Sequence, residues 1–177
     1  MKNKNAKNSW FFKALSLTVI LAFSVPSMTN AQSAKTNFSG KWAMNSDKSK
    51  LPEGQGGGMR MGGGDMVVTQ AGNMLTVERT RTGRNGQEMT TTTKYTLDGK
   101  ETVNTTQRGE RKSVAKWSAD GKSLTITTDM SFNMNGQTRE MKSTEVWTLE
   151  NPSTLSVKST RNGRNGDINM TIVYDKK

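Results

Sequence analysis

Apolar and polar residues alternate along short stretches of the chain, and turn signals separate these stretches about every 8–12 residues. Such alternation is typical of β-strands that bury one face. Most of the turn signals are Asn-Gly or Asp-Gly pairs, which supply the positive φ that tight hairpin turns need. The pattern predicts ten strands, at residues 38–44, 66–70, 74–81, 88–97, 101–107, 111–117, 123–132, 138–149, 154–161 and 167–174.

The lengths of the turns also predict which residues of neighbouring strands face each other. Two-residue turns are assumed at Asp120-Gly121 and Asn135-Gly136, and a three-residue bulged loop is assumed at Asp98-Gly99. A five-residue loop is assumed at 150–154 and a four-residue loop at 162–165. All of these hairpins place large apolar residues on one shared face of the sheet. The predicted partners are Tyr95 with Val103, Trp117 with Leu124, Leu124 with Trp147, Met130 with Met141, Leu149 with Leu155, Trp147 with Val157, and Val157 with Met170.

Ten hairpin-linked strands leave two sheet edges exposed unless the sheet closes on itself. We therefore expect an all-β fold, an antiparallel up-and-down meander that closes into a β-barrel with the apolar face inside. An open sheet and a two-sheet sandwich are the alternatives. Residues 54–64 contain seven glycines and predict a flexible loop between the first two strands.

Residues 1–31 have the order of a secretory signal peptide. A basic stretch up to Lys13 precedes an apolar run from Ala14 to Val25, and small residues around Ala31 suit cleavage. The apolar run is shorter than the roughly 20 residues that a membrane-spanning helix needs. We expect cleavage near Ala31, export to the periplasm or outside the cell, and one domain over residues 32–177.

Charge and composition narrow the classes of function. Residues 1–31 hold four of the 26 basic residues and none of the 15 acidic ones, so the rest has a net charge of +7. The chain contains no histidine and no cysteine, which excludes disulfides, His-ligated zinc and Ser-His-Asp or Cys-His catalysis. We therefore expect a protein that is not an enzyme, with no catalytic residue, no metal and no cofactor.

Both ends of the domain resemble a known family. The run Phe38-Ser39-Gly40-Lys41-Trp42 resembles the F-x-G-x-W opening of the calycins, the lipocalins and fatty-acid-binding proteins. The last strand, with Tyr174, resembles the ending of the fatty-acid-binding branch, and ten strands match that branch. The resemblance implies a ligand-binding barrel with structural roles for Gly40, Trp42 and Tyr174. Two departures are Ile172, where that branch has a ligand-binding arginine, and the glycine loop, where it has a helical lid.

A longer form of the opening motif is G-x-W-x-x-N-x-x-K-S. It resembles the start of uncharacterised exported bacterial lipocalin-like proteins. The motif residues in this chain are Gly40, Trp42, Asn45, Lys48 and Ser49.

Arginines gather at one end of the predicted barrel. Loops of a meander alternate between its two ends, and all nine arginines lie in or beside the loops of one end. The predicted register turns four of them inward: Arg79, Arg81, Arg139 and Arg161. Arginine binds carboxylate and phosphate in bidentate fashion. An arginine-lined mouth above an apolar interior suits a small amphiphile with an anionic head group. The residues expected to line the cavity are Trp117, Met130, Trp147 and Met170.

Other interpretations of the same residues stay open. The arginines could pair with acids at the same end of the barrel, namely Glu88, Glu110, Glu140 and Asp167. The barrel could be filled, and its basic end could bind a polyanion, a membrane surface or a protein partner. Met59, Met61 and Met66 could bind Cu(I), although methionine is also an adaptable core filler. Sequence-specific nucleic-acid binding is not expected, because no aromatic residues are interleaved with the basic ones and few exposed aromatic residues are expected.

Overall fold

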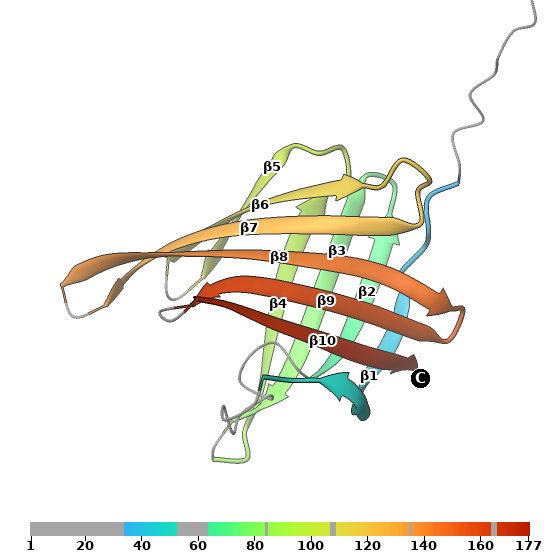
Figure 1. The fold of residues 1–177 in the computed structure, drawn as a ribbon, viewed down its shortest axis with the longest axis horizontal. Coiled ribbons are helices and arrows are strands. Elements are labelled where there is room, and N and C mark those ends of the chain that lie inside the picture. The colour runs from blue at the N-terminus through green and yellow to red at the C-terminus, as the bar shows by residue number, and fades with distance from the viewer. Residues whose placement is uncertain (1–33, 53–63, 84, 107–108, 135, 164–165) are drawn as a thin grey trace, which may run out of the picture. The chain divides into compact units, whose positions relative to one another are not determined.

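The computed structural model describes residues 34–52, 64–83, 85–106, 109–134, 136–163 and 166–177, which form ten antiparallel strands (Figure 1). The all-β prediction is confirmed, and each predicted strand has an observed counterpart. Among these residues no helix is long and apolar enough to cross a membrane. The predicted signal peptide and the core of the glycine loop lie outside them. The strands are β1 Gly40–Lys50, β2 Asp65–Ala71, β3 Met74–Thr82, β4 Glu88–Thr96, β5 Glu101–Thr106, β6 Gly109–Trp117, β7 Ser123–Met134, β8 Gln137–Asn151, β9 Thr154–Gly163 and β10 Gly166–Lys176.

The strands form one sheet in the order β4-β3-β2-β1-β10-β9-β8-β7-β6-β5. The first strand pairs with the last, and β4 and β5 are the two edges of the sheet. The sheet curls into a nearly closed barrel, in which β4 and β5 approach each other (Figure 1). We call the end with the β3–β4, β5–β6, β7–β8 and β9–β10 connections the arginine end, and the opposite end the floor.

Side chains bridge the two edge strands in place of a backbone ladder. The amide group of Asn104 on β5 bonds both the backbone N–H and the backbone C=O of Lys94 on β4, each at 2.9 Å. The N–H of Thr96 donates to the hydroxyl of Thr102 at 3.0 Å. These contacts keep Tyr95 level with Val103, as predicted, but the two strands share no backbone ladder. Val103 is half-exposed on the outside, so it does not share the inner face that the pairing was expected to give it.

The other predicted registers are confirmed, with one exception. Trp117 faces Leu124, Met130 faces Met141, and Trp147 lies between Leu124 and Val157. At the last hairpin, however, Val157 faces Ile172 instead of Met170. Gly163 and Gly166 already pair, so two residues connect the strands where four were expected. A shift of two residues leaves each side chain on its predicted face, and the inner face survives the error.

The barrel's floor is closed by the segment before β1. Phe38 is fully buried and stacks on the ring of Trp117, with centroids 5.7 Å apart, and it meets Trp147 edge-on at 5.9 Å. The indole N–H of Trp42 donates to the carbonyl of Phe38 at 2.9 Å. The N–H of Thr36 reaches the carbonyl of Gly121 in the β6–β7 turn, at 2.9 Å. The sequence just after the expected cleavage point is thus part of the core.

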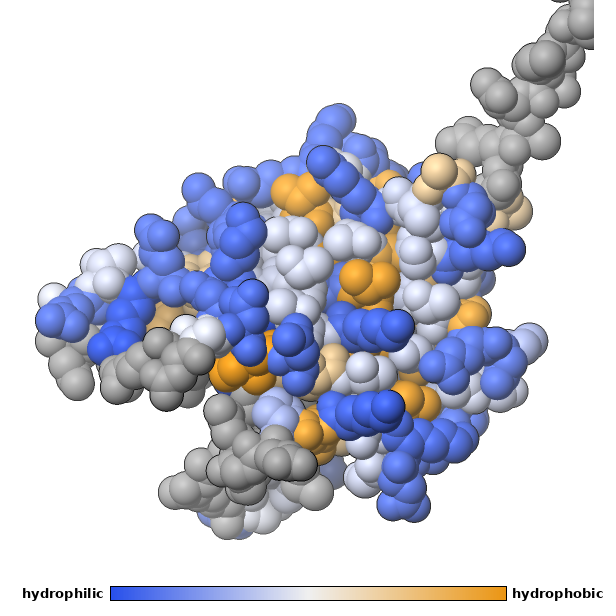
Figure 2. Space-filling model, viewed as in Figure 1, coloured by the Kyte–Doolittle hydropathy of each residue, from blue (hydrophilic) through white to orange (hydrophobic). Residues whose placement is uncertain are grey.

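The outer surface is mostly polar. Hydrophilic side chains predominate on the face shown in Figure 2, with apolar residues scattered among them. The core cluster lies inside the barrel, where strand residues that alternate with the polar ones are buried. This arrangement explains how a chain with so few apolar residues folds, because one face of each strand stays in water.

Candidate functional site

The inner face of the barrel changes character between the floor and the arginine end. The floor half is apolar and is filled by Phe38, Trp42, Leu75, Leu124 and Leu155, all almost fully buried. Beyond it, the inward positions become polar on several strands. The inward residues toward the arginine end are Arg79 and Arg81 after Val77, Ser113 and Arg111 before Ala115, Ser143 and Glu145 before Trp147, and Ser159 and Arg161 after Val157.

At the boundary between the two halves, an ion pair crosses the barrel. Arg79 Nη2 on β3 lies 3.3 Å from Glu145 Oε2 on β8. The same carboxylate oxygen accepts the indole N–H of Trp147 at 2.9 Å. The guanidinium group lies over the Trp147 ring, 5.7 Å from its centroid, and Arg79 Nη1 is 3.5 Å from the Tyr174 hydroxyl. Because β3 and β8 are not neighbours in the sheet, this cluster joins opposite walls through the interior.

The two tyrosines of the chain both face this cluster, and burial changes their pKa. Desolvation and the charge of Glu145 raise the pKa of Tyr95 to about 12, against the opposing charges of Arg79 and Arg111. Burial also raises the pKa of Tyr174, which Arg79 partly offsets. Burial alone would lower the pKa of Arg79, but the charge of Glu145 raises it above its ordinary value. Arg79 is therefore a permanent cation and both tyrosines are neutral at physiological pH.

The structure places the predicted site residues at different depths. Arg79, Arg81 and Arg161 are partly buried at inward positions, whereas Arg139 is inward by register but exposed beyond Met141. Trp147 is fully buried and Trp117 is partly buried against Phe38. Met130 and Met170 are buried in the arginine half. Met66 lies in the core, and the other two methionines of the proposed copper site fall outside the described residues.

Two functional candidates escaped the sequence analysis. Glu145 pairs with Arg79, whereas the acids expected to pair with arginines were those beside the loops. Arg111 faces the interior opposite Met130, but only its place beside a loop was noticed. The alternation of inward and outward residues along each strand predicts the inward direction of both. Glu145 lies two residues from the inward Trp147, and Arg111 lies six residues from the inward Trp117.

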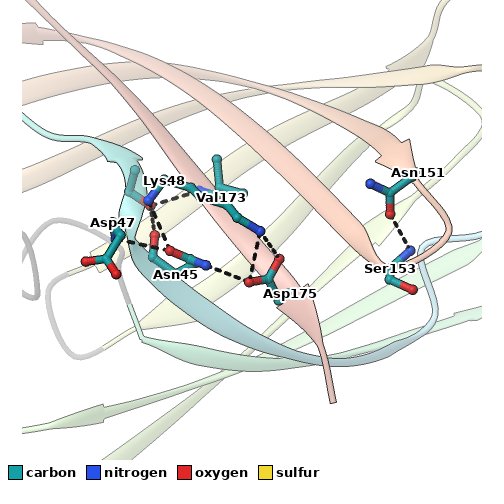
Figure 3. A network of polar contacts seen from close by, with 8 residues as sticks. Asn45, Asp47, Lys48, Asn151, Ser153, Val173 and Asp175 are labelled. Atoms are coloured by element: carbon teal, nitrogen blue, oxygen red, sulfur yellow. Dashed lines mark hydrogen bonds and ion pairs between the residues drawn. The ribbon is translucent and has the colours of Figure 1, made fainter.

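The polar residues of the extended opening motif form a structural clasp between β1 and β10 (Figure 3). The Asn45 side chain accepts the backbone N–H groups of Asp47 and Lys48 and donates to Asp175 Oδ2 at 2.6 Å. Lys48 Nζ bonds the other oxygen of Asp175 at 3.0 Å. These bonds fasten the irregular end of β1 to β10, where their backbone register shifts.

The serine of the motif completes the clasp. Its Oγ donates to the carbonyl of Asn45 at 2.6 Å and accepts the N–H of Val173 at 3.0 Å, so Ser49 replaces a ladder bond that the shift removes.

The other two motif residues have backbone and core roles. Gly40 has a φ of 153°, which favours glycine, and Trp42 packs in the core.

Two depressions lie on the outside of the barrel. One of about 460 Å³ is at the floor, between Thr36, Pro152 and Lys176. The other, of about 270 Å³, lies on the outer face of β5, β6 and β7, between Glu101, Lys112 and Thr125. Neither includes the interior arginines, so we base the candidate site on the inward polar cluster.

A scan against protein-family models found no match, and a search of curated proteins found none either. Among solved structures, the chain is similar to zebrafish ileal bile acid-binding protein in complex with cholic acid. The sequences are 21% identical, the TM-score is 0.52, and the match covers 79% of this chain and 98% of the other. Together with the ten-stranded, nearly closed barrel, this likeness identifies the fold as calycin-like. The class that the fold defines is thus a calycin-like β-barrel.

Proposed function

We propose that this chain is an exported, non-enzymatic binding protein for a small amphiphilic or apolar molecule, which it holds in the barrel. The observation that carries the proposal is the division of the inner face. Aromatic and aliphatic side chains fill the floor half, and arginines share the inward positions of the other half with methionines and small polar residues. Such a gradient matches a ligand with an apolar body and a polar head. The structural neighbour, crystallised with cholic acid, supports a small amphiphile.

An anionic head group fits the charge of the arginine half. Among the described residues, the inward positions of this half carry five arginines, Arg79, Arg81, Arg111, Arg139 and Arg161, against one acid, Glu145. A buried cation needs a counter-charge or hydrogen-bond acceptors. An anionic head would supply both, and water would supply neither charge nor bidentate geometry.

The test is native mass spectrometry of residues 32–177, purified without detergent from a host that exports the protein. We expect a reproducible extra mass that is released as a small organic molecule when the protein is denatured. A clean mass for the free protein, with no uptake from a lipid extract, would argue against a ligand in the barrel.

The alternative is a surface-interaction protein that binds polyanions through its basic end. The inward direction of the five described arginines disfavours a polyanion site built from them, because a polyanion needs cations on the outer surface. The two proposals differ in their dependence on salt. Binding to a polyanion such as heparin would weaken steeply as the salt concentration rises, whereas a ligand enclosed in the barrel is expected to depend on salt only weakly.

A further inference from the structure

The five inward arginines are not equivalent, and the proposed function leaves open which of them binds the head group. Arg79 is already engaged. It pairs with Glu145, lies over the ring of Trp147 and approaches the Tyr174 hydroxyl. Its charge is balanced by a carboxylate of the protein itself, so a ligand anion would have to compete with Glu145 for it.

Three other arginines are also poor candidates. Arg139 is exposed, and water competes for its hydrogen bonds. Arg81 and Arg161 already interact with other groups. The Nε atom of Arg161 is buried without an acceptor among the described residues, but the rest of that side chain is engaged.

Arg111 differs from these four, because it is partly buried and makes no hydrogen bond or ion pair with another described residue. It precedes the buried Ser113 by one inward step on β6, and it faces Met130 on β7 and Asn104 on β5. Its Nε atom is buried, and no atom of the described residues accepts its hydrogen bond. Buried donors are almost always satisfied in native proteins, so this N–H requires a partner. Its charge also acts on Tyr95, which places it on the border of the polar cluster.

We propose that Arg111 binds the oxyanion of the ligand's head group. Arg79 stays paired with Glu145 and does not bind the ligand. The Nε–H and the adjacent Nη–H of arginine form a fork that matches two oxygens of a carboxylate, sulfonate or phosphate. The surroundings of Arg111 strengthen such a pair, because Met130 on the next strand excludes water from one side. The inference rests on the proposed function and names the specificity-determining residue of that site.

The experiment compares two probes that differ in the head group, decanoate and 1-decanol. Their affinities are measured by displacement of bound 1-anilinonaphthalene-8-sulfonate. The variants are Arg111→Gln, which removes the charge, and Arg111→Lys, which keeps the charge but removes the fork. Lys112→Gln is the matched control, since it removes one charge from the outer face of the same strand. The double variant Arg79→Met/Glu145→Gln removes the internal pair without changing the net charge.

We expect the unaltered protein to prefer decanoate, and Arg111→Gln to weaken decanoate about 10-fold or more while leaving decanol unchanged. Arg111→Lys should lose part of the preference, and Lys112→Gln and the double variant should keep it. Thermal unfolding of each variant shows whether it is folded, and Arg111→Lys replaces Arg111→Gln if the latter is not.

Three outcomes would overturn the inference. If folded Arg111→Gln keeps the full preference, or the double variant loses it, then Arg79 or another residue binds the head. If both probes bind the unaltered protein equally, no residue recognises the charge, although the proposed small-ligand function survives. If neither probe binds and the purified protein carries no extra mass, the proposed function itself fails.

Discussion

At the scale of the residue, the side chain of Asn45 holds the end of β1 and a residue of β10 together. Its amide caps two backbone N–H groups with the oxygen and holds Asp175 with the nitrogen. The motif that resembles exported lipocalin-like proteins therefore has a physical reason in this chain. Each polar member of the motif stabilises the junction between β1 and β10, and none is needed to contact a ligand.

The clasp makes stability depend on pH. Hydrogen bonds from Asn45 and Lys48 lower the pKa of Asp175, so the folded state favours the ionised carboxylate. This contribution is present above the ordinary carboxyl pKa and is lost as the pH falls through the lowered one. We predict that Asp175→Asn is less stable than the unaltered protein near neutral pH and that the two converge in acid, as measured by urea unfolding. A constant difference at all pH values would contradict this, and Asp129→Asn, at an exposed ion pair, is the control.

The interior tyrosines make a second prediction at this scale. In the folded protein Tyr95 should stay neutral through pH 10 and ionise near 12, as ultraviolet absorbance reports. Because its pKa is raised, its contribution to stability is present below the ordinary pKa and is lost as the pH rises through the raised one. Glu145→Gln should lower the pKa of Tyr95 and Tyr174, since Glu145 raises both. Titration of both tyrosines at pH 10 in the folded protein would disprove the buried cluster.

Single residues also show where sequence reasoning stopped. The inward direction of Arg79, Arg81 and Arg161 follows from strand alternation alone, and the structure has them there. The partner of Arg79 does not follow from alternation, because Glu145 approaches it across the barrel from a strand 66 residues away. Contacts through the interior depend on the curvature and tilt of the sheet, which hairpin spacing does not encode.

At the scale of the element, the seam between β4 and β5 departs most from a simple meander. The Asp98-Gly99 turn has the expected glycine, with a φ of 79°, yet the strands it joins share no ladder. The sequence indicates this departure, because a two-residue turn at Asp98-Gly99 would place Tyr95 opposite Thr102. A bulged loop would remove the mismatch, whereas in the structure the strands share no ladder and are joined by the side chains of Asn104 and Thr102.

Asn104 supplies two of the hydrogen bonds across this seam, so the seam should depend strongly on its side chain. We predict that Asn104→Ala speeds hydrogen exchange at the Lys94 amide about tenfold, because that N–H loses its acceptor. Amides of β7 and β8 should not change. Thr105→Ala, at the neighbouring outward position, is the control. Unchanged protection at Lys94 in Asn104→Ala would show that something other than this amide closes the seam.

The whole molecule depends on how its floor is closed. Phe38 precedes the first strand but lies between two tryptophans of the core. We predict that Phe38→Ala lowers the free energy of unfolding by about 3–5 kcal/mol, as a fully buried phenylalanine does. Phe132→Ala, at a partly exposed position of the arginine end, should have a much smaller effect. Equal effects in urea unfolding would mean that the floor contributes no more than the opposite end.

The pairing of β1 with β10 has a consequence for how the chain can be reconnected. Lys177 donates its backbone N–H to Lys41, and Thr36 and Lys176 line the same depression, so the two ends of the barrel sequence are near each other. A linker of about eight residues could join them. A circular permutant opened between Asp98 and Gly99 would then run from β5 through β10 and β1 to β4, in the order of the sheet. We expect it to fold and unfold cooperatively, whereas opening the β7–β8 hairpin would divide an extensive ladder. In this permutant the order of the strands along the chain would equal their order in the sheet, and the two edge strands, β5 and β4, would hold the chain termini.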